Sequence, residues 1–515
     1  MQQVINFTQR NPIWTVVFVS IFISFVNIIT DDVINSDGII YSEAAVKFYS
    51  GDWQGALAHF SWPFYPIIVG AVSKLSFLDF EITAQIINTA LLALLAYVFM
   101  RCSQLMGGDK LVVICAGVLF LTNVTLNGYR DLVIRDHGYW AMFFIALYFF
   151  LQYHQTKLVK YAIGFGVSIL IAILLRIEGI IFALLVPFIL LFQNISWRER
   201  LYQSILPLIP LIIVASIALM TVFLTPALME KISAATHSEG NLLGPLNYFA
   251  TTFQGVFGGI VEKGKLIEEL IFDLNARNMG TESIVAILVM MLILKTISAS
   301  GYIPLVFSIL TVGSQRIRQS MSGLNVITGF MLINLLILTT VVSSKMFLTP
   351  RYTMTLALLI SLIASFGLAD FFRSQVASSS RWRKRGKVLL IVIFSYMFLD
   401  GLISTGASKD YLRESGKWFK NNIPAEAKLF SNEESIYYYS GRSVDRNILL
   451  FIFEETRFSK LPDIKETWRY DYIAIKISRK QKGFEEKVIA WAGAQAIHRA
   501  ANERGDALLI FKVQK

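Results

Sequence analysis

The segment PIWTVVFVSIFISFVNIIT, residues 12–30, decides the fold class of this chain. It carries no charge and has the length of about 20 residues that an α-helix needs to cross the hydrocarbon core of a bilayer. The segment follows Arg10, as the apolar part of a signal peptide would, but Asp31 and Asp32 come next in place of a small-residue cleavage site. We therefore predict a membrane anchor that is retained.

The same pattern continues along the chain. Of 515 residues, 55% are hydrophobic and only 16% are charged. Soluble proteins carry about 25% charged residues. The difference excludes a disordered chain, a collagen-like repeat and an ordinary soluble enzyme. We predict a polytopic α-helical membrane protein with about 11 transmembrane helices. Ten further apolar segments are 81–100, 111–126, 138–153, 161–175, 179–193, 203–225, 283–312, 323–343, 353–372 and 387–405. The 283–312 segment contains Gly301 and Pro304, and is either one broken span or a span followed by a re-entrant piece.

Charges in the loops predict the orientation. The stretches between alternate spans are rich in Lys and Arg, most strongly at 381–385, and basic loops of membrane proteins face the cytoplasm. The net charge of +11 therefore does not imply a nucleic-acid partner. We expect a multi-pass protein of the cytoplasmic (inner) membrane with a cytoplasmic N-terminus. Cys102 and Cys115 lie in or beside apolar segments, so a disulfide framework is not expected.

Charge density divides the chain into two parts. About a third of residues 406–515 are charged, against about an eighth of residues 1–405, and the tail is long enough to fold as a domain. We predict a transmembrane body over 1–405 and a small extracytoplasmic α/β domain over 406–515. Within this tail, 410–421 and 485–494 have helical patterns, and strand patterns occupy 427–430, 472–477 and 507–513. The tail is expected to support the body or to touch an acceptor.

Two external loops are long. In the first, residues 31–80, helical periodicity over 39–49 precedes the aromatic, proline-rich stretch 62–66, so we expect amphipathic helices that lie on the membrane. The second, residues 226–282, has amphipathic stretches that could cover a cleft as a lid. Asp37, in the first loop, is either a loop or capping acid or a carboxylate that takes a proton from an acceptor hydroxyl or holds a cation.

Three more charged patches adjoin apolar segments. Ionisable groups in such places are costly and indicate function, although ordinary ion pairs or contacts with lipid headgroups also explain them. Arg351 offers the bidentate guanidinium that suits a phosphate. The residues of the patches are Arg135, Asp136 and His137; Arg176 and Glu178; and Arg351 and Tyr352.

The order of these features resembles the GT-C superfamily of membrane glycosyltransferases, in particular the group that is similar to protein O-mannosyltransferases and aminoarabinose transferases. The shared features are an Asp after the first span, then Tyr41, "GDW" at 51–53 and the "WPFYP" stretch at 62–66. Many members have Asp-Glu where this chain has Asp37-Gly38. Asp31 and Asp32 remain alternatives to Asp37.

The resemblance implies a glycosyltransferase that moves a sugar from a polyprenyl-phosphate donor to a hydroxyl acceptor (a glycan, a lipid or a protein) at the outer face of the cytoplasmic membrane. Direct displacement would invert the anomeric centre. The resemblance assigns Asp37 and Asp136 to catalysis, and Arg351 and Arg176 to the donor phosphate, whose charge a cation would neutralise as the bond breaks. Candidates for substrate binding are Tyr41, Glu43, His59, Trp62, Tyr65, Arg135, His137, Glu178 and Tyr352.

Cofactors and other functions stay open at this stage. No cofactor is certain, and a divalent metal is possible because metal dependence varies within the superfamily. The chain lacks His/Cys zinc spacing. A transporter or flippase of lipid-linked glycans, or a non-catalytic membrane scaffold, are the alternatives. Transport favours charged residues deep within the spans, whereas the charges here gather at their ends.

Overall fold

The computed structural model describes residues 10–30, 33–224, 259–266, 268–269, 279–373, 381–403, 406–444, 449, 456–457, 459–461 and 467–513. Asp31, Asp32 and most of the predicted 226–282 lid lie outside these residues. The chain forms two compact units. The first comprises Met1–Phe25, Ile86–Arg130 and Arg135–Leu402, and the second comprises Val26–Gln85, Asp131–Ile134 and Ile403–Lys515.

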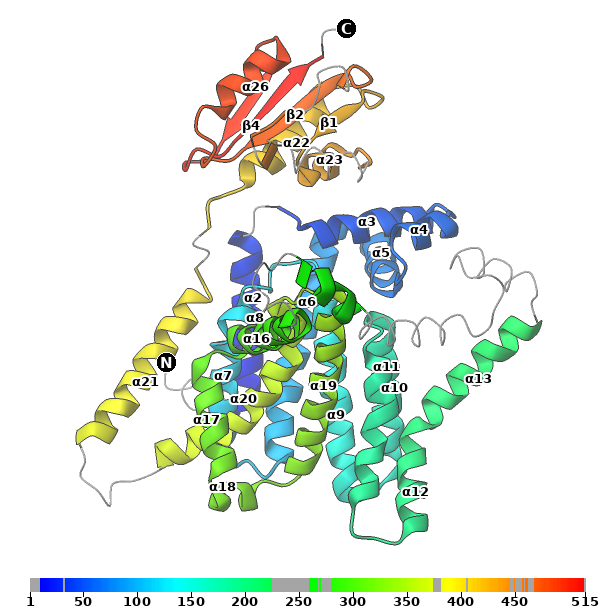
Figure 1. Ribbon diagram of the computed structural model, residues 1–515, viewed down its shortest axis with the longest axis vertical. Helices are drawn as coiled ribbons and strands as arrows, with labels where there is room; N and C mark the ends of the chain where they lie inside the picture. The colour runs from blue at the N-terminus through cyan, green and yellow to red at the C-terminus, as the bar shows by residue number, and fades with distance from the viewer. Residues whose placement is uncertain are drawn as a thin grey trace. The chain divides into compact units, whose positions relative to one another are not determined.

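Helices make up the body of the protein (Figure 1). Within the described residues, six helices are long and apolar enough to cross a membrane: Pro12–Thr30, Phe80–Leu105, Trp197–Ala218, Gly280–Ser300, Leu324–Lys345 and Pro350–Arg373. The helices are α2 (Pro12–Thr30), α6 (Phe80–Leu105), α7 (Lys110–Leu121), α8 (Val124–Asn127), α9 (Asp136–Thr156), α10 (Val159–Leu175), α11 (Gly179–Leu185), η1 (Val186–Phe192), α12 (Trp197–Ile205), η2 (Leu206–Leu208), α13 (Ile209–Leu224), α16 (Gly280–Ser300), α17 (Tyr302–Gly313), α18 (Gln315–Ser320), α19 (Leu324–Lys345), α20 (Pro350–Arg373) and α21 (Arg381–Asp400).

These helices confirm a helical, multi-span membrane protein. Each apolar segment found in the sequence contains a helix, while the number of crossings stays a prediction. The ambiguous 283–312 segment is two helices, α16 and α17, which meet at Gly301. Gly301 has a φ of +78°. Residues with a Cβ atom avoid this backbone conformation, so glycine permits the break at this point.

Helix α20 forms the centre of the first unit. It packs against α7, α16, α17 and α19, and every residue from Thr353 to Ala369 is buried. Two serines of α20 donate hydroxyl hydrogen bonds to backbone carbonyls of the same helix. Ser361 bonds to Ala357 at 2.9 Å, and Ser365 bonds to Leu362 at 2.6 Å. This pattern lets a polar side chain lie in an apolar interior without an unpaired donor.

A buried arginine attaches the first span to the rest of this unit. The Nη1 atom of Arg130 donates to the hydroxyls of Ser20 and Ser24 on α2, at 3.0 and 2.9 Å. Its Nε atom donates to the side-chain oxygen of Asn127 at 2.8 Å. Arg130 is only 1% exposed. Neutral oxygens thus hold this guanidinium between α2 and α8.

The second unit contains the helices of the first external loop: α3 (Ser36–Tyr49), α4 (Trp53–His59) and α5 (Phe64–Ser76). Helix α3 begins three residues before the predicted helix and ends at the predicted residue. On α5, Tyr65 and Val69 are buried, whereas Ile68 and Val72 on another face are exposed. An exposed apolar stripe of this kind is typical of a helix that lies in a membrane surface.

The tail folds around a four-stranded sheet with the order β1-β2-β4-β3. β1 and β2 are parallel, and β4 is antiparallel to both of its neighbours, β2 and β3. The strand predicted at 472–477 matches β2, whereas β3 and α23 were not predicted. The tail elements are α22 (Asp410–Asn422), β1 (Leu429–Ser431), α23 (Glu434–Ser440), β2 (Tyr472–Ile477), α26 (Phe484–Ala492), β3 (His498–Ala501) and β4 (Ala507–Lys512).

Helices cover both faces of this sheet (Figure 1). Alternate residues of a strand point to opposite faces. Accordingly, Ala474 packs with residues of α22 and α23, whereas its neighbours Ile473 and Ile475 pack with Phe484 and Val488 of α26. The nearly continuous apolar sequence of β2 reflects burial on both sides.

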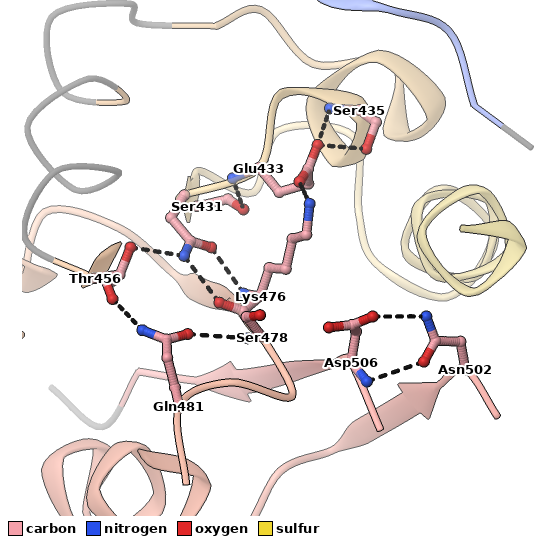
Figure 2. Close-up of polar contacts among 10 residues, drawn as sticks. Ser431, Glu433, Ser435, Thr456, Lys476, Ser478, Gln481, Asn502 and Asp506 are labelled. Carbon is pink, nitrogen blue, oxygen red and sulfur yellow. Dashed lines mark hydrogen bonds and ion pairs between the residues drawn. The ribbon is translucent and has the colours of Figure 1, made fainter. Parts of the chain in front are cut away.

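Polar side chains bond to one another beside the sheet, at the C-terminal ends of β1 and β2 (Figure 2). Lys476 pairs with Glu433, and Asn502 exchanges hydrogen bonds with Asp506. The amide of Asn432 bonds in both directions with the backbone of Lys476, at 2.7 and 3.0 Å, and so continues the ladder beyond β1. These groups satisfy one another, which favours a structural role for them.

Candidate active site

The main charged cluster of the first unit forms where helices begin and end. Asp136 is the first residue of α9, Arg176 immediately follows α10, Glu178 immediately precedes α11, and Arg351 is the second residue of α20. Helices α9 and α10 are extensively packed neighbours joined by a two-residue turn. The start of α9 therefore lies beside the end of α10, which brings Asp136 to Arg176.

Arg176 joins two carboxylates. Its Nη1 atom forms an ion pair with Oδ1 of Asp136. Its Nη2 and Nε atoms donate to the two oxygens of Glu178, at 2.7 and 3.3 Å. The side chains of Arg176 and Asp136 are 6% and 1% exposed. Burial of this kind is costly unless charges are paired and bonded, and the two carboxylates meet that condition.

Arg351 approaches the same acid from α20. Its Nε atom lies 3.6 Å from Oδ2 of Asp136, which is longer than a hydrogen bond. Its side chain is 26% exposed. The two oxygens of Asp136 thus face two different arginines, of which Arg351 is the more accessible. This geometry leaves Arg351 as the guanidinium best able to meet an anion from solution.

Aromatic rings line the cluster. The guanidinium carbon of Arg176 lies 4.4 Å from the ring centre of Tyr352 and 5.6 Å from that of Tyr139. Stacking over such rings orients a guanidinium and adds attraction to its positive charge. Tyr352 was predicted from its place beside Arg351. Tyr139 was not, although it lies one helical turn after Asp136 on α9 and so on the same face.

A pocket opens at this cluster. It is lined by both charged and apolar residues: Tyr139, Trp140, Arg176, Glu178, Asn334, Ile337, Leu338, Val341, Arg351, Tyr352 and Thr355. The sequence reasoning missed Asn334 on α19 and Thr355 on α20, whose side chains bond at 2.7 Å. An amide in the middle of an apolar segment was the available signal, because such groups need a partner in a membrane.

The ionisation of Glu178 follows from its partners. Burial raises the pKa of its carboxyl, but the charge and hydrogen bonds of Arg176, a backbone hydrogen bond and the charge of Arg135 together lower that pKa from 4.5 to about 2. Glu178 is therefore an anion at neutral pH. With Arg176, Asp136 and Arg351 it gives a site of two cations and two anions, in which an incoming phosphate would compete with the carboxylates for the guanidinium groups.

The neighbours of Asp136 differ in exposure. Arg135 immediately precedes α9 and is half-buried. His137 is fully buried and packs edge-on against Trp140, with ring centres 5.4 Å apart. This packing favours a structural role for His137, and its part in substrate binding stays a prediction.

Asp37 belongs to the second unit. It is the second residue of α3 and is half-buried. The residue before the helix, Asn35, bonds with the backbone of Val133 in both directions, at 2.8 and 3.3 Å. A Cβ atom on Gly38 would lie 2.9 Å from Cβ of Val133 and 2.7 Å from Cγ1 of Ile34. This close packing favours glycine at the position that follows Asp37.

Four of the other candidates of the first loop form two groups around α3. Tyr41 is buried, and its ring packs against those of Phe60 and Tyr65, at centre distances of 5.0 and 5.3 Å. Glu43 lies 2.8 Å from His59, the last residue of α4. Trp62 is half-buried in the turn before α5. The structure thus brings together Glu43 with His59, and Tyr41 with Tyr65.

Within the part of the chain that the structure describes, no group of three or more His, Cys, Asp or Glu side chains has the arrangement of a metal site. The possible divalent metal therefore has no ligand set that can be named from these residues, and we assign no step to it.

Comparison with known proteins places the fold. The chain resembles the archaeal oligosaccharyltransferase AglB from Archaeoglobus fulgidus in complex with an inhibitory peptide and a dolichol-phosphate (TM-score 0.52, 12% identity, 94% of this chain and 72% of that one). A structure of the same oligosaccharyltransferase tethered to an acceptor peptide gives a TM-score of 0.51 and 11% identity, over 99% of this chain and 75% of that one.

ArnT from Cupriavidus metallidurans, without ligand, aligns over 97% of both chains at 12% identity, with a TM-score of 0.42. No family profile and no curated protein matches the sequence. The likeness to AglB is one of fold, and with the elements described above it confirms a mostly helical, multi-span membrane protein with a small C-terminal sheet. The chain has the fold of the GT-C membrane glycosyltransferases.

Proposed function

We propose that the protein is a membrane glycosyltransferase. It takes a sugar from a polyprenyl-phosphate donor and transfers it to a hydroxyl of a glycan, lipid or protein at the outer face of the cytoplasmic membrane. The observation that carries this proposal is the cluster of Asp136, Arg176, Glu178 and Arg351 at helix ends of a GT-C fold. The dolichol-phosphate bound to AglB supports a lipid-phosphate donor.

In this reaction the acceptor oxygen attacks the anomeric carbon of the sugar, and the bond from that carbon to the phosphate oxygen breaks. The acceptor proton passes to the carboxylate of Asp37, and the polyprenyl phosphate leaves with the bonding electrons. Direct displacement of this kind inverts the anomeric centre. Asp37 acts as the general base, a role typically worth about 10²–10⁴-fold in rate.

The arginines act on the leaving group. Arg351, the more accessible of the two, binds the donor phosphate and stabilises its charge as the bond breaks. Arg176, stacked on Tyr352, adds positive charge behind it. Asp136 holds both guanidinium groups through its two oxygens. We therefore assign Asp136 to the positioning of the arginines, whereas the family resemblance assigned it to catalysis.

Transfer in proteoliposomes tests the proposal. The donors are a panel of radiolabelled polyprenyl-phosphate sugars, with a membrane extract as the acceptor pool. We expect the native protein to transfer from at least one donor and Asp37→Asn to lose about a hundredfold or more of that rate. Asp52→Asn is the matched control, because Asp52 caps α4 in the same loop and asparagine also caps helices well.

Two results would contradict the proposal. Transfer from no donor would remove the enzyme function, and a flippase assay with the same donors would follow. Equal transfer by the native protein and Asp37→Asn would remove the assigned base. Both variants are first compared with the native protein in thermal unfolding, so that a misfolded variant is not mistaken for an inactive one.

A further inference from the structure

The tail contacts the chain immediately before Asp37. The hydroxyl oxygen of Tyr439, on α23, accepts a hydrogen bond from the backbone N–H of Ile34 at 2.9 Å. The preceding residue, Val33, packs against the tail core that includes Ile436 and Tyr437. The start of the Asp37 segment is therefore tied to the tail by both a hydrogen bond and apolar contact.

A second contact lies on the other side of Asp37. Tyr438, the neighbour of Tyr439 on α23, lies near the side chain of Ser42 on α3, where the two helices pack together. Ile34 precedes Asp37 by three residues and Ser42 follows it by five. Adjacent tyrosines of one short helix thus lie at both flanks of the segment that carries the proposed base, and the hydrogen bond of Tyr439 holds its start.

Other charged groups fix the orientation of Tyr439. Its hydroxyl donates to Glu81, in the first turn of α6, with both carboxylate oxygens at 3.1 Å. Arg413 on α22 reaches the same carboxylate at 3.1 Å, and its guanidinium carbon lies 5.4 Å from the centre of the Tyr439 ring. Glu81 is 12% exposed in its side chain. A hydroxyl that both accepts and donates to partners of this kind has one preferred orientation.

We propose that Tyr439 is a positioning residue for Asp37, and that the tail serves the reaction by holding α3 through it. This inference rests on the proposed function. Without the hydroxyl, the N–H of Ile34 and the carboxylate of Glu81 each lose a partner, and the start of α3 gains freedom. Positional freedom of a catalytic group lowers turnover, because less of the population has the reactive geometry.

The test combines Tyr439→Phe with two measurements. Amide hydrogen exchange of the full-length protein reports on residues 33–42, and transfer kinetics give kcat and the donor KM. We expect faster exchange in 33–42, unchanged exchange in β2, and a kcat about five- to tenfold lower, as the loss of one buried hydrogen bond allows. Donor KM stays unchanged, because Arg351 and its partners are intact.

Two further variants serve as a control and as a second test. Tyr470→Phe is the matched control, since Tyr470 packs against Phe430 inside the tail and should change neither measurement. Glu81→Gln keeps an acceptor for Tyr439 but loses the ion pair with Arg413. It is measured in the same way, and it stands in for Tyr439→Phe if that variant does not fold. We expect it to show the same changes with smaller amplitude.

The outcomes separate this inference from the proposed function. Faster exchange in 33–42 together with the lower kcat supports the inference. Unchanged exchange, or faster exchange with an unchanged kcat, overturns it while the native protein still transfers sugar and the proposed function stands. A native protein that transfers from no donor overturns the proposed function, and the positioning role falls with it.

Discussion

The two aspartates assigned to the reaction are held in different ways. Asp136 is 1% exposed, and its two oxygens face Arg176 and Arg351. Asp37 is half-buried in the first turn of α3, on a segment whose start is held by a tyrosine and by the backbone of Val133. A carboxylate placed between two guanidinium groups suits the ordering of those groups. A carboxylate on a positioned, partly accessible helix start suits the acceptance of a proton.

The variant Asp136→Asn removes the charge of the buried aspartate, and we expect it to have the largest effect on stability. Asparagine has the shape of aspartate but leaves Arg176 with Glu178 as its remaining carboxylate partner in the cluster. Loss of one partner of a buried ion pair costs about 3–5 kcal/mol. We expect a clearly lower Tm in detergent and a loss of sugar transfer. Unfolding at the native temperature would contradict the role of Asp136 as an anchor of the arginines.

The variant Arg351→Gln tests the arginine that we assign to the donor phosphate. It removes the accessible guanidinium and leaves the pair of Asp136 and Arg176. Hydrogen bonds to charged groups contribute about 1.5–3 kcal/mol, so we expect the donor KM to rise about tenfold or more. The measurement is transfer at varied donor concentration. The matched control is Arg373→Gln, at the opposite end of α20, where Arg373 pairs with Asp109. A similar rise in both variants would show that Arg351 has no special contact with the donor.

The smallest effect concerns acid pH. The pKa of Glu178 is lowered from 4.5 to about 2 because the hydrogen bonds and positive charges around it, chiefly those of Arg176, together outweigh the effect of burial. Since the folded-state pKa is depressed, the stabilisation is complete above the unfolded value and is lost as the pH falls from 4.5 towards 2. We expect the difference in Tm between the native protein and Glu178→Gln to be constant at higher pH and to vanish in that window. A difference that already shrinks near neutral pH would contradict the depressed pKa.

Much of the architecture could be predicted because the spans depend on a strong, local signal. A run of apolar residues long enough to cross the hydrocarbon has few alternatives to a helix. The same holds for β2, which is apolar on both faces. Two tail elements lack such a signal: the short strand β3, with sequence HRAA, and helix α23, with three consecutive tyrosines. They form through their packing in the tail domain.

The site was predictable only in part. Asp136, Arg176 and Arg351 stood out because each is charged beside an apolar segment, and the structure brings all three together. The pairing of Arg176 with Tyr139 depends on how α9 packs against α10. The bond between Glu81 and Tyr439 joins residues 358 positions apart. Contacts across such distances follow from the packing of whole elements, and no local pattern encodes them.

Direct binding of the donor tests the central claim, which is the division of labour between the two aspartates. The probe is a radiolabelled polyprenyl-phosphate sugar that the native protein uses in transfer, and its binding is measured for Asp37→Asn and Asp136→Asn in nanodiscs. We expect Asp37→Asn to bind the donor as the native protein does but not to transfer it, whereas folded Asp136→Asn binds it weakly. Native binding by Asp136→Asn together with lost binding by Asp37→Asn would contradict the account.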